Sequence, residues 1–388
     1  MEEIKTTNDL WENHSLFKTL QFDHRYLILG KMENALLDLP EDFNLKTEGF
    51  SVLKNPIRSI CFGNGKIKVL LWSQMHGNET TTTKAIFDLL NLFEKAGSNA
   101  LLKDILANCT LKIIPVLNPD GAEAYTRENA NKIDLNRDAQ ALSQPESRIL
   151  DAVFKEFQPD FCFNLHDQRS IYSVGDQNKS ATVSFLSPAM DVEKTVNETR
   201  KISMHHIVAI NECLQKYIPN QVGRYDDSFN PNCVGDKFQS LDVPTLLFEA
   251  GHFPNDYQRE KTRKLIFVAL LKALSSISSN PFSTAGFEKY STIPQNKKLF
   301  FDVLIRNVYI KGESCDIGIQ FEEKLENGHI IFTPVLKEIG DLKGFYGHSE
   351  MEGEGKPLLV NNSTEIAQEM KIIKINLGSS VISLNFVK

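Results

Sequence analysis

The chain has 388 residues, of which 41% are hydrophobic and 24% are charged, and its formal net charge is −7. This length allows two or three domains around one sizeable core, and the hydrophobic content is too high for a disordered chain. The mildly acidic balance, without a run rich in lysine and arginine, argues against nucleic acid or an anionic membrane as a partner. We therefore expect the partner to be a small molecule or a peptide.

The chain has no segment typical of membrane insertion or secretion. No apolar run reaches the roughly 20 residues that cross a bilayer, and the first residues lack the apolar stretch of a signal peptide. The six cysteines are far apart, and none forms a Cys-x-x-Cys pair. We expect a cytoplasmic protein with reduced thiols that does not act at a membrane, and the sequence leaves its oligomeric state open.

The first part of the chain differs in composition from the rest. Residues 1–45 are polar, rich in aromatic residues and predicted to be partly helical, and we treat them as an N-terminal extension. Two apolar and β-branched runs come next, at 57–62 and 67–72, and the Gly-Asn-Gly sequence between them is typical of a hairpin turn. Residues 85–97 have apolar side chains spaced by three and four and end at Gly97, which predicts a helix.

Strands and helices alternate through the middle of the chain. Further apolar strands are expected at 111–117, 161–165 and 244–248, and further helices at 148–157, 193–217 and 257–277. This alternation predicts a layered α/β domain over residues 46–279. Short alternating segments separated by Gly, Asn and Pro then predict a β-rich C-terminal domain over residues 280–388.

A histidine and a glutamate lie just after the strand predicted at 67–72. His76 and Glu79 are three residues apart across a strand-to-helix turn, where open α/β sheets gather ligand sites. The pair can bind one metal ion, although this spacing also arises by chance and a glutamate at a helix start is often only a cap. His166 ends the strand predicted at 161–165, so it can reach the same edge of the sheet. Two histidines and a glutamate leave a zinc ion one open position, which is typical of catalytic zinc sites.

Segments rich in Asn, Asp and Arg lie between these candidate ligands, at 118–121, 127–131 and 134–137. A solvated loop could have the same composition. A hydrolase that acts beside a chain terminus, however, needs a planar cation for a carboxylate and a fixed positive donor where negative charge develops on the scissile carbonyl. Arg127 and Arg137 could meet these two needs.

Two more carboxylates occur at strand ends. Glu249 ends the strand predicted at 244–248, and a carboxylate at the tip of a buried strand should not face the core without a partner. At the edge of a metal site, Glu249 could accept a proton from metal-bound water; a salt-bridged or capping glutamate is the alternative. Asp167, next to His166, could orient a metal ligand or cap a helix.

The motifs occur together and in a fixed order. They are HGNE at 76–79, NPDG at 118–121, RENAN at 127–131, DLNRD at 134–138, NLHD at 164–167 and FEAG at 248–251. The set resembles that of the M14 zinc metallocarboxypeptidases, and it is especially similar to the carboxypeptidase N/E-like and short bacterial branches. The resemblance spans about Gly49 to Leu274. It implies a three-layer α/β/α domain around a mixed, mainly eight-stranded sheet, with the small C-terminal β domain packed beside it.

The resemblance also implies a catalytic role for each matching position. His76, Glu79 and His166 would bind one zinc ion per chain. Glu249 would be the general base that activates the metal-bound water and later protonates the leaving amine. Arg127 would join the zinc in stabilising the oxyanion of the tetrahedral intermediate.

The same resemblance implies how the substrate is bound. Asn136 and Arg137 would hold the C-terminal carboxylate of a peptide or peptide-like substrate. The family's mobile active-site tyrosine has no clean counterpart, and Tyr225 is the nearest candidate. Asp236 lies in the segment ahead of the base that sets specificity in the family, so it could face a basic side chain, although a loop aspartate is more often a turn residue. The histidines at 205–206 lie outside every motif, and we interpret them as structural or surface residues.

The predicted function is a zinc-dependent metallocarboxypeptidase that hydrolyses the amide bond next to a free C-terminal carboxylate. Two alternatives remain open. An N-acyl amino acid deacylase of the aspartoacylase and succinylglutamate desuccinylase type would share the HGNE and DLNR motifs and an added β domain, although NPDG and RENAN favour the peptidase. A catalytically silent, zinc-containing peptide-binding domain would not need an intact Glu249.

Overall fold

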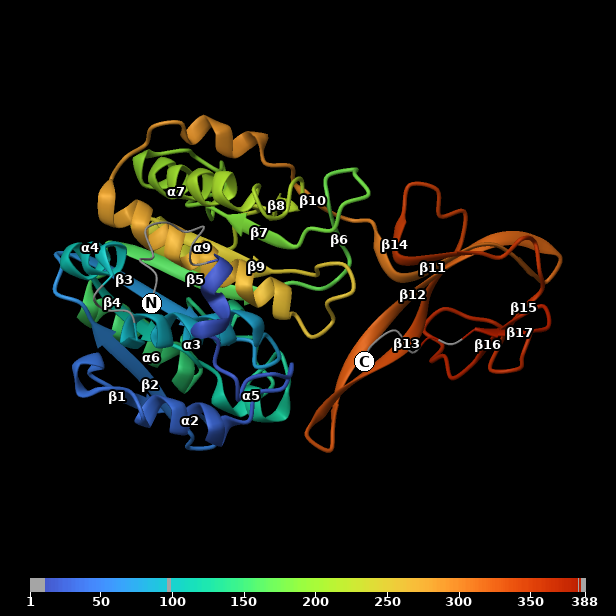
Figure 1. Cartoon of the computed structure of the whole chain (residues 1–388), viewed down its shortest axis with the longest axis horizontal. Helices are drawn as coiled ribbons and strands as arrows, with labels where there is room; N and C mark the ends of the chain where they lie inside the picture. The colour runs from blue at the N-terminus through green and yellow to red at the C-terminus, as the bar shows by residue number, and fades with distance from the viewer. Residues whose placement is uncertain (1–10, 96–98, 383, 385–388) are drawn as a thin grey trace.

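One large mixed sheet forms the centre of the α/β part of the chain. The structure, a computed structural model, describes residues 11–95, 99–382 and 384. The strands of this sheet are β1 (Lys46–Phe50), β2 (Pro56–Phe62), β3 (Ile67–Ser73), β4 (Cys109–Ile114), β5 (Phe161–Asp167), β7 (Val183–Leu186), β8 (Val222–Arg224) and β9 (Thr245–Ala250). Their order is β1-β2-β4-β3-β5-β9-β7-β8 (Figure 1). The strands β4, β3, β5 and β9 are parallel, whereas β1, β2 and β7 make antiparallel pairs, so the predicted mixed eight-stranded sheet is confirmed.

Helices cover both faces of this sheet. They are α2 (Leu29–Leu37), α3 (Thr81–Lys95), α4 (Ala100–Asn108), α5 (Pro119–Ala124), α6 (Pro145–Phe157), α7 (Glu198–Leu214), α8 (Val234–Ser240) and α9 (Glu260–Ser279). One apolar core joins the sheet to α3, α4, α7 and α9, and a second core on the opposite face joins it to α6 and α8. Figure 1 shows α3, α7 and α9 in front of the sheet and α6 behind it. The predicted three-layer α/β/α architecture is therefore confirmed.

The helix predicted at 85–97 corresponds to α3, which begins four residues earlier, at Thr81. The predicted end at Gly97 lies outside the described residues. In the described part of the chain, no helix combines the length and the apolar character that a membrane span requires.

The hairpin predicted between 57–62 and 67–72 is wrong. The two strands form, as β2 and β3, but β4 lies between them, antiparallel to β2 and parallel to β3. The intervening turn packs against the junction of α4 and β4, where the Asn64 amide donates to the carbonyl of Leu106 over 2.9 Å. A Cβ atom on Gly65 would lie 2.0 Å from the backbone nitrogen of Cys109, so only glycine allows this approach. The Gly-Asn-Gly turn predicts only that the chain changes direction there. It does not predict which distant strand pairs with the strands on either side of the turn.

The N-terminal extension packs onto the α/β domain through a buried ion pair. Asp88 in α3 is 0% exposed, and its carboxylate accepts two bonds, of 2.5 and 2.7 Å, from the guanidinium of Arg263 in α9. The same carboxylate lies 2.8 Å from Nε2 of His14, in the short 3₁₀ helix η1 (His14–Leu16), and accepts from the backbone amide of Thr19. A buried carboxylate requires such partners, so the segment of the extension around His14 and Thr19 is anchored in the interior of the domain.

Two small sheets lie beyond the α/β domain (Figure 1). The 3₁₀ helix η4 (Phe287–Thr292) still packs against α7, and β10 (Asn296–Lys298) pairs with β6 (Tyr172–Val174). The C-terminal sheets then consist of β11 (Phe300–Ile310), β12 (Glu313–Glu326), β13 (His329–Gly340) and β14 (Tyr346–Glu352), followed by β15 (Leu358–Val360), β16 (Ile375–Leu377) and β17 (Ser380–Ile382). The last part of the chain is thus β-rich, with its own apolar core.

Side chains on β5 alternate between the two faces of the large sheet. Phe161, Phe163 and Leu165 pack in the core of α3, α7 and α9, whereas Cys162 packs in the opposite core with α6 and α8. Because the side-chain period of a strand is two, Asn164 and His166 lie on the same face as Cys162. The strand therefore carries a polar residue and a metal-ligand candidate from the core towards the edge of the sheet.

His206, in α7, should make the protein sensitive to acid. It is 0% exposed, and Nδ1 and Nε2 each lie 2.9 Å from Ser276 Oγ and the Pro281 carbonyl, respectively. Burial lowers the pKa of His206 to about 4. An unfolded histidine binds its proton at about pH 6.5, so this residue stabilises the fold above that pH and the stabilisation is lost as pH falls towards 4.

We expect the lowered pKa to remove about 2 kcal/mol of unfolding free energy between pH 7 and pH 5. Urea unfolding of His206→Gln should show a correspondingly smaller loss, because glutamine stays uncharged and can still donate to the Pro281 carbonyl. His24→Gln, at an exposed histidine, is the matched control. An unchanged pH dependence in His206→Gln would contradict this account.

Candidate active site

A cavity of about 1060 Å³ lies at the carboxyl ends of β3, β5 and β9. All nine residues predicted for the site line it: His76, Glu79, Arg127, Asn136, Arg137, His166, Tyr225, Asp236 and Glu249. The N-terminal extension contributes Arg25, and the C-terminal part contributes residues of β12 and β13, including Gln320 and Lys337. Three parts of the chain therefore meet around one cavity.

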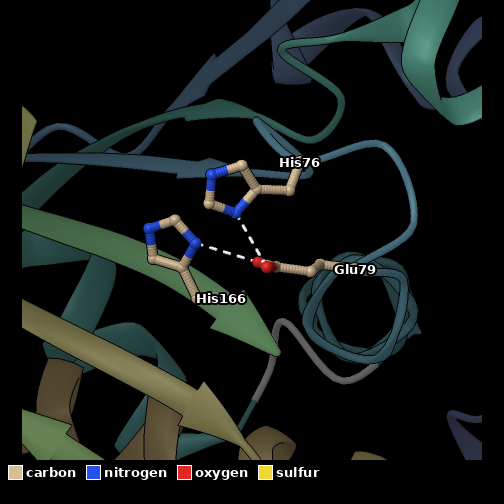
Figure 2. Close-up of side chains that lie close together, drawn as sticks. All are labelled: His76, Glu79 and His166. Atoms are coloured by element: carbon tan, nitrogen blue, oxygen red, sulfur yellow. Dashed lines mark hydrogen bonds and ion pairs between the residues drawn. The ribbon is translucent and has the colours of Figure 1, made fainter. Parts of the chain in front are cut away.

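The three predicted metal ligands converge at this edge of the sheet. Each offers a ligand atom, and these atoms lie within 4.8 Å of one another. His76 Nδ1 lies 2.7 Å from one carboxylate oxygen of Glu79, and His166 Nδ1 lies 2.9 Å from the other. Figure 2 shows both rings directed at the Glu79 carboxylate, one from the end of β3 and one from β5. The residues His76, Glu79 and His166 are 2%, 8% and 3% exposed, respectively, so bulk water does not separate them.

The HGNE and NPDG motifs hold the His76 loop in place by a close backbone contact. A Cβ atom on Gly77 would lie 1.9 Å from the carbonyl carbon of Gly121, so the two loops can approach only without a side chain there. Asn118 caps α5 by accepting from the Gly121 amide and donates to the carbonyl of Met75, one residue before His76. The motif NPDG therefore shapes the ligand loop and does not itself line the cavity.

Further carboxylates orient the ligands. Asp134 Oδ1 lies 3.0 Å from Nε2 of His76, which fixes the ring with Nδ1 towards Glu79. Asp167 accepts from the amides of Thr81 and Thr82 and so caps α3, and its own amide donates to Glu79. The helix-capping interpretation of Asp167 is confirmed.

Burial and neighbouring charges shift the pKa values of Glu79, His76 and His166 in different directions. Burial opposes the charge of Glu79, yet His76 and His166 hold the pKa of that carboxyl well below its usual range. Burial likewise opposes a charge on His76, but Glu79 and Asp134 raise the pKa of the imidazole above its usual value. For His166, burial dominates and lowers the pKa.

Glu249 lies on the strand next to His166. In the register of β5 and β9, the two residues are direct neighbours, and Glu249 is 7% exposed. Its Oε2 has no hydrogen-bond partner in the part of the chain that the structure describes. Burial, together with the charges of Glu79 and Asp167, raises the pKa of Glu249 well above its usual range. A carboxyl with a raised pKa takes up a proton readily, as a general base must.

Two arginines, Arg127 and Arg137, line the cavity that holds the ligand cluster. Arg127 donates through Nε to Asp134 over 3.0 Å, and its Nη1 lies 3.4 Å from Glu79. Arg137, at the end of the 3₁₀ helix η3 (Leu135–Arg137), is exposed in the cavity and donates to the Asn136 carbonyl. Among the described residues Arg137 has no carboxylate partner, so its guanidinium is available for an anionic group.

The two residues with the weakest sequence signals also reach the cavity. Tyr225 follows β8, and its hydroxyl lies 2.9 Å from that of Tyr172. Burial and the charge of Glu249 raise the pKa of Tyr225, which therefore stays neutral. Asp236 lies in the first turn of α8 and is 6% exposed, and burial raises its pKa to about 6. It is therefore a buried helix residue and not part of a loop turn.

Sequence reasoning missed the role of three residues. Asp134 belongs to the DLNRD motif, so its contact with His76 had a local signal. Arg25 and Glu323 had none, because neither belongs to a motif. Glu323 of β12 accepts from Arg25 over 2.9 Å and from the Tyr125 hydroxyl over 2.5 Å, and Arg25 also donates to the carbonyl of Tyr257. This network ties the C-terminal part to the wall of the cavity.

The donor set fits a zinc ion. Two imidazole nitrogens and a carboxylate oxygen are ligands that Zn²⁺ prefers, and a site with three protein ligands keeps an open position. Asp134 supports His76 from behind, as carboxylates commonly support zinc-bound imidazoles.

Comparison with known proteins supports the same assignment. Residues 31–206 match the zinc carboxypeptidase family, peptidase M14. Carboxypeptidase 2 of Trichophyton rubrum is 28% identical to this chain over 102 residues, which cover 26% of this chain and 19% of that protein. Gamma-D-glutamyl-L-diamino acid endopeptidase 1 of Lysinibacillus sphaericus is 34% identical over 79 residues, which cover 19% of this chain and 20% of that protein. The chain therefore spans about a fifth of the length of these curated relatives.

The likeness to solved structures extends over more of the chain. Carboxypeptidase A of Helicoverpa armigera superposes with a TM-score of 0.53 at 16% identity, over 71% of this chain and 82% of that one. At this identity the likeness concerns the fold. The chain therefore has a carboxypeptidase-like fold, and its residues 31–206 are similar to peptidase M14, the zinc carboxypeptidase family.

Proposed function

We propose that the protein is a zinc-dependent metallocarboxypeptidase that hydrolyses the amide bond next to a free C-terminal carboxylate. The observation that carries the proposal is the convergence of His76, Glu79 and His166 within 4.8 Å, with Glu249 on the neighbouring strand beside His166. The similarity of residues 31–206 to the peptidase M14 family supports hydrolysis of peptides.

The metal would be one zinc ion per chain. His76 and His166 would bind it through Nδ1, and Glu79 through its carboxylate. When bound, zinc polarises the scissile carbonyl and lowers the pKa of a water molecule in the site.

Arg137 and Asn136 would hold the substrate at its terminus. The guanidinium of Arg137 can bind a carboxylate through two parallel hydrogen bonds, which fixes both the charge and the orientation of the substrate. The Asn136 side-chain oxygen accepts from the amide of Val234 over 2.9 Å, which leaves the Asn136 amide group for the same carboxylate.

Glu249 and Arg127 would carry out the chemical step. A water oxygen attacks the scissile carbonyl carbon while its proton moves to Glu249 Oε2. Arg127 stabilises the negative charge that develops on the carbonyl oxygen. The carbon–nitrogen bond then breaks, and the proton on Glu249 moves to the leaving amine, so the carboxylate is regenerated.

The candidate substrates are peptides, murein fragments and acyl amino acids. One relative is named for γ-D-glutamyl-L-diamino acid bonds, so murein-type peptides belong among the substrates to be tried. The C-terminal residues that line the cavity, such as Gln320 and Lys337, would bound the space upstream of the scissile bond. An N-acyl amino acid deacylase is the second candidate, because its substrate extends little beyond the scissile bond and would fit a space that is bounded on that side.

Zinc binding is expected to stabilise the folded protein. At a free zinc concentration one hundred times the dissociation constant, the unfolding free energy should rise by about 2.7 kcal/mol. Thermal unfolding with zinc and with a chelator, together with metal analysis, should give one zinc per chain. His166→Ala should lose both effects, and His24→Ala, at an exposed histidine outside the site, should lose neither. Zinc retained by His166→Ala would refute the ligand set.

Replacement of the proposed base tests the reaction itself. Glu249→Gln keeps the shape of the side chain but cannot take up the proton, so kcat should fall by about 10²–10⁴-fold. Zinc content and peptide affinity should change little. The assay should compare peptides with free and amidated C-termini, murein-type peptides, and N-acetyl and N-succinyl amino acids.

The outcomes of this assay separate the candidates. Hydrolysis of free but not amidated peptides supports the carboxypeptidase. Turnover of acyl amino acids alone would favour the deacylase. If the zinc-loaded wild type binds peptides and hydrolyses none of these substrates, the protein is a binding domain.

A further inference from the structure

Residues of the C-terminal sheets form part of the cavity. Four consecutive residues of β12, Gln320, Phe321, Glu322 and Glu323, line it together with Lys337 of β13. We call these five residues the C-terminal wall. Figure 1 shows the sheets that carry them beside the α/β domain. The cavity is therefore completed by a part of the chain that follows the α/β domain.

Hydrogen bonds fix the wall to the segment that follows β5. Nε2 of Gln320 donates to Ser170 Oγ over 2.6 Å, and Nε2 of His348 lies 2.8 Å from the Ser170 carbonyl. The amide of Phe300 donates to the carbonyl of Ile171 over 3.1 Å. Because Ser170 itself lines the cavity, these contacts join the wall to the edge of the cavity that continues from β5.

Further contacts with buried side chains hold the wall in position. Glu323 accepts over 2.9 Å from Arg25, which is 4% exposed. Asp302 of β11 is 1% exposed and accepts from the Tyr257 hydroxyl over 2.9 Å and from the Phe321 amide over 2.7 Å. Separation of these groups would leave charges unpaired in the interior, which is unfavourable. The wall is therefore a fixed part of the cavity.

The contacts of the site lead from the proposed carboxylate site to the wall by way of the metal-ligand candidates. Asp134, three residues before Arg137, lies 3.0 Å from Nε2 of His76. The rings of His76 and His166 are neighbours, with centroids 4.9 Å apart, and His166 precedes Ser170 by four residues. A substrate whose carboxylate is bound by Arg137 and whose scissile bond lies at the metal-ligand candidates would therefore extend towards the wall.

The distance from the metal-ligand candidates to the wall is short. Four residues of extended chain span at most about 14 Å, so the Ser170 backbone lies within that distance of the His166 backbone. Gln320 contacts Ser170, which places the wall in the same range. An extended peptide advances about 3.3 Å per residue, so no more than about four residues upstream of the scissile bond would fit before the wall.

The wall contains an ion pair whose removal leaves the contacts with Ser170, Arg25 and Asp302 intact. Nζ of Lys337 lies 2.9 Å from a carboxylate oxygen of Glu322. Both residues line the cavity, and Glu322 is exposed. Their side chains therefore occupy space that a longer peptide would need.

We propose that the C-terminal wall selects substrates by length, so that the protein acts on short free peptides of up to about five residues and not on the C-terminal tails of folded proteins. The inference rests on the proposed function, because it uses the same scissile bond and the same carboxylate site. The C-terminal sheets thereby acquire a function that no motif of the sequence specifies.

The test compares a tripeptide, a pentapeptide and a decapeptide that share their last three residues, together with a folded protein that ends in the same residues. In the wild type, kcat/KM for the decapeptide should be about tenfold or more below that for the tripeptide, because the longer chain meets the wall. The folded protein should not be shortened. In the double variant Glu322→Ala, Lys337→Ala, the ratio of kcat/KM for the decapeptide to that for the tripeptide should rise about threefold to tenfold.

The matched control is the double variant Lys324→Ala, Glu326→Ala. It also removes a lysine–glutamate ion pair from this hairpin, and neither residue lines the cavity, so its length dependence should equal that of the wild type. Affinities measured in the Glu249→Gln background separate binding from turnover. There the decapeptide should bind more weakly than the tripeptide, and Glu322→Ala, Lys337→Ala should reduce this difference.

The outcomes separate this inference from the proposed function. If no peptide of any length is hydrolysed, the proposed function fails and the inference fails with it. If all lengths are hydrolysed with similar kcat/KM, or if the folded protein is shortened, only the length selection is overturned. The same holds if Glu322→Ala, Lys337→Ala changes the turnover of all lengths by one factor, or if the control variant alters the length dependence equally.

Discussion

The site depends on the carboxylate of Glu79, which lies buried between two imidazoles. Burial of a charged carboxylate is unfavourable unless cations or hydrogen-bond donors surround it. Glu79 meets this condition through His76 from the end of β3, His166 from the end of β5 and the amide of Asp167. Satisfying one charge therefore holds three segments of the chain at one point, and the same donors form a metal-binding set.

Neighbouring residues that are not metal-ligand candidates hold these three side chains in position. Asp134 orients the His76 ring. The close backbone contact between Gly77 and Gly121 positions the loop that carries His76. Asp167 caps α3, so the helix that follows Glu79 is anchored to the strand that carries His166. The site therefore combines two strands, which carry His166 and Glu249, with the short loop between β3 and α3, which carries His76 and Glu79 and is fixed by these contacts.

The cavity also contains polar atoms that reduce stability in the absence of a ligand. His166 Nε2, Glu249 Oε2 and both polar side-chain atoms of Asn164 are buried and have no hydrogen-bond partner among the residues that the structure describes. Such groups normally find partners inside a protein. Their presence around one cavity is consistent with a site shaped for a metal and a substrate, since proteins depart from local stability rules mainly at functional positions.

The sequence by itself determined the α/β class through side-chain periodicity, and its short motifs located the residues around the cavity, because motifs and periodicity are local properties. The mixed sheet was expected only from the resemblance of these motifs to a known family. Sequence reasoning failed at the hairpin between β2 and β3, since the insertion of β4 between them depends on a strand about 40 residues away. Only the tertiary structure brought Arg25, Tyr125 and Glu323 together across three parts of the chain. Only the tertiary structure left Asn164 without a partner, because hydrogen-bond satisfaction of a buried side chain depends on neighbours that no local pattern specifies.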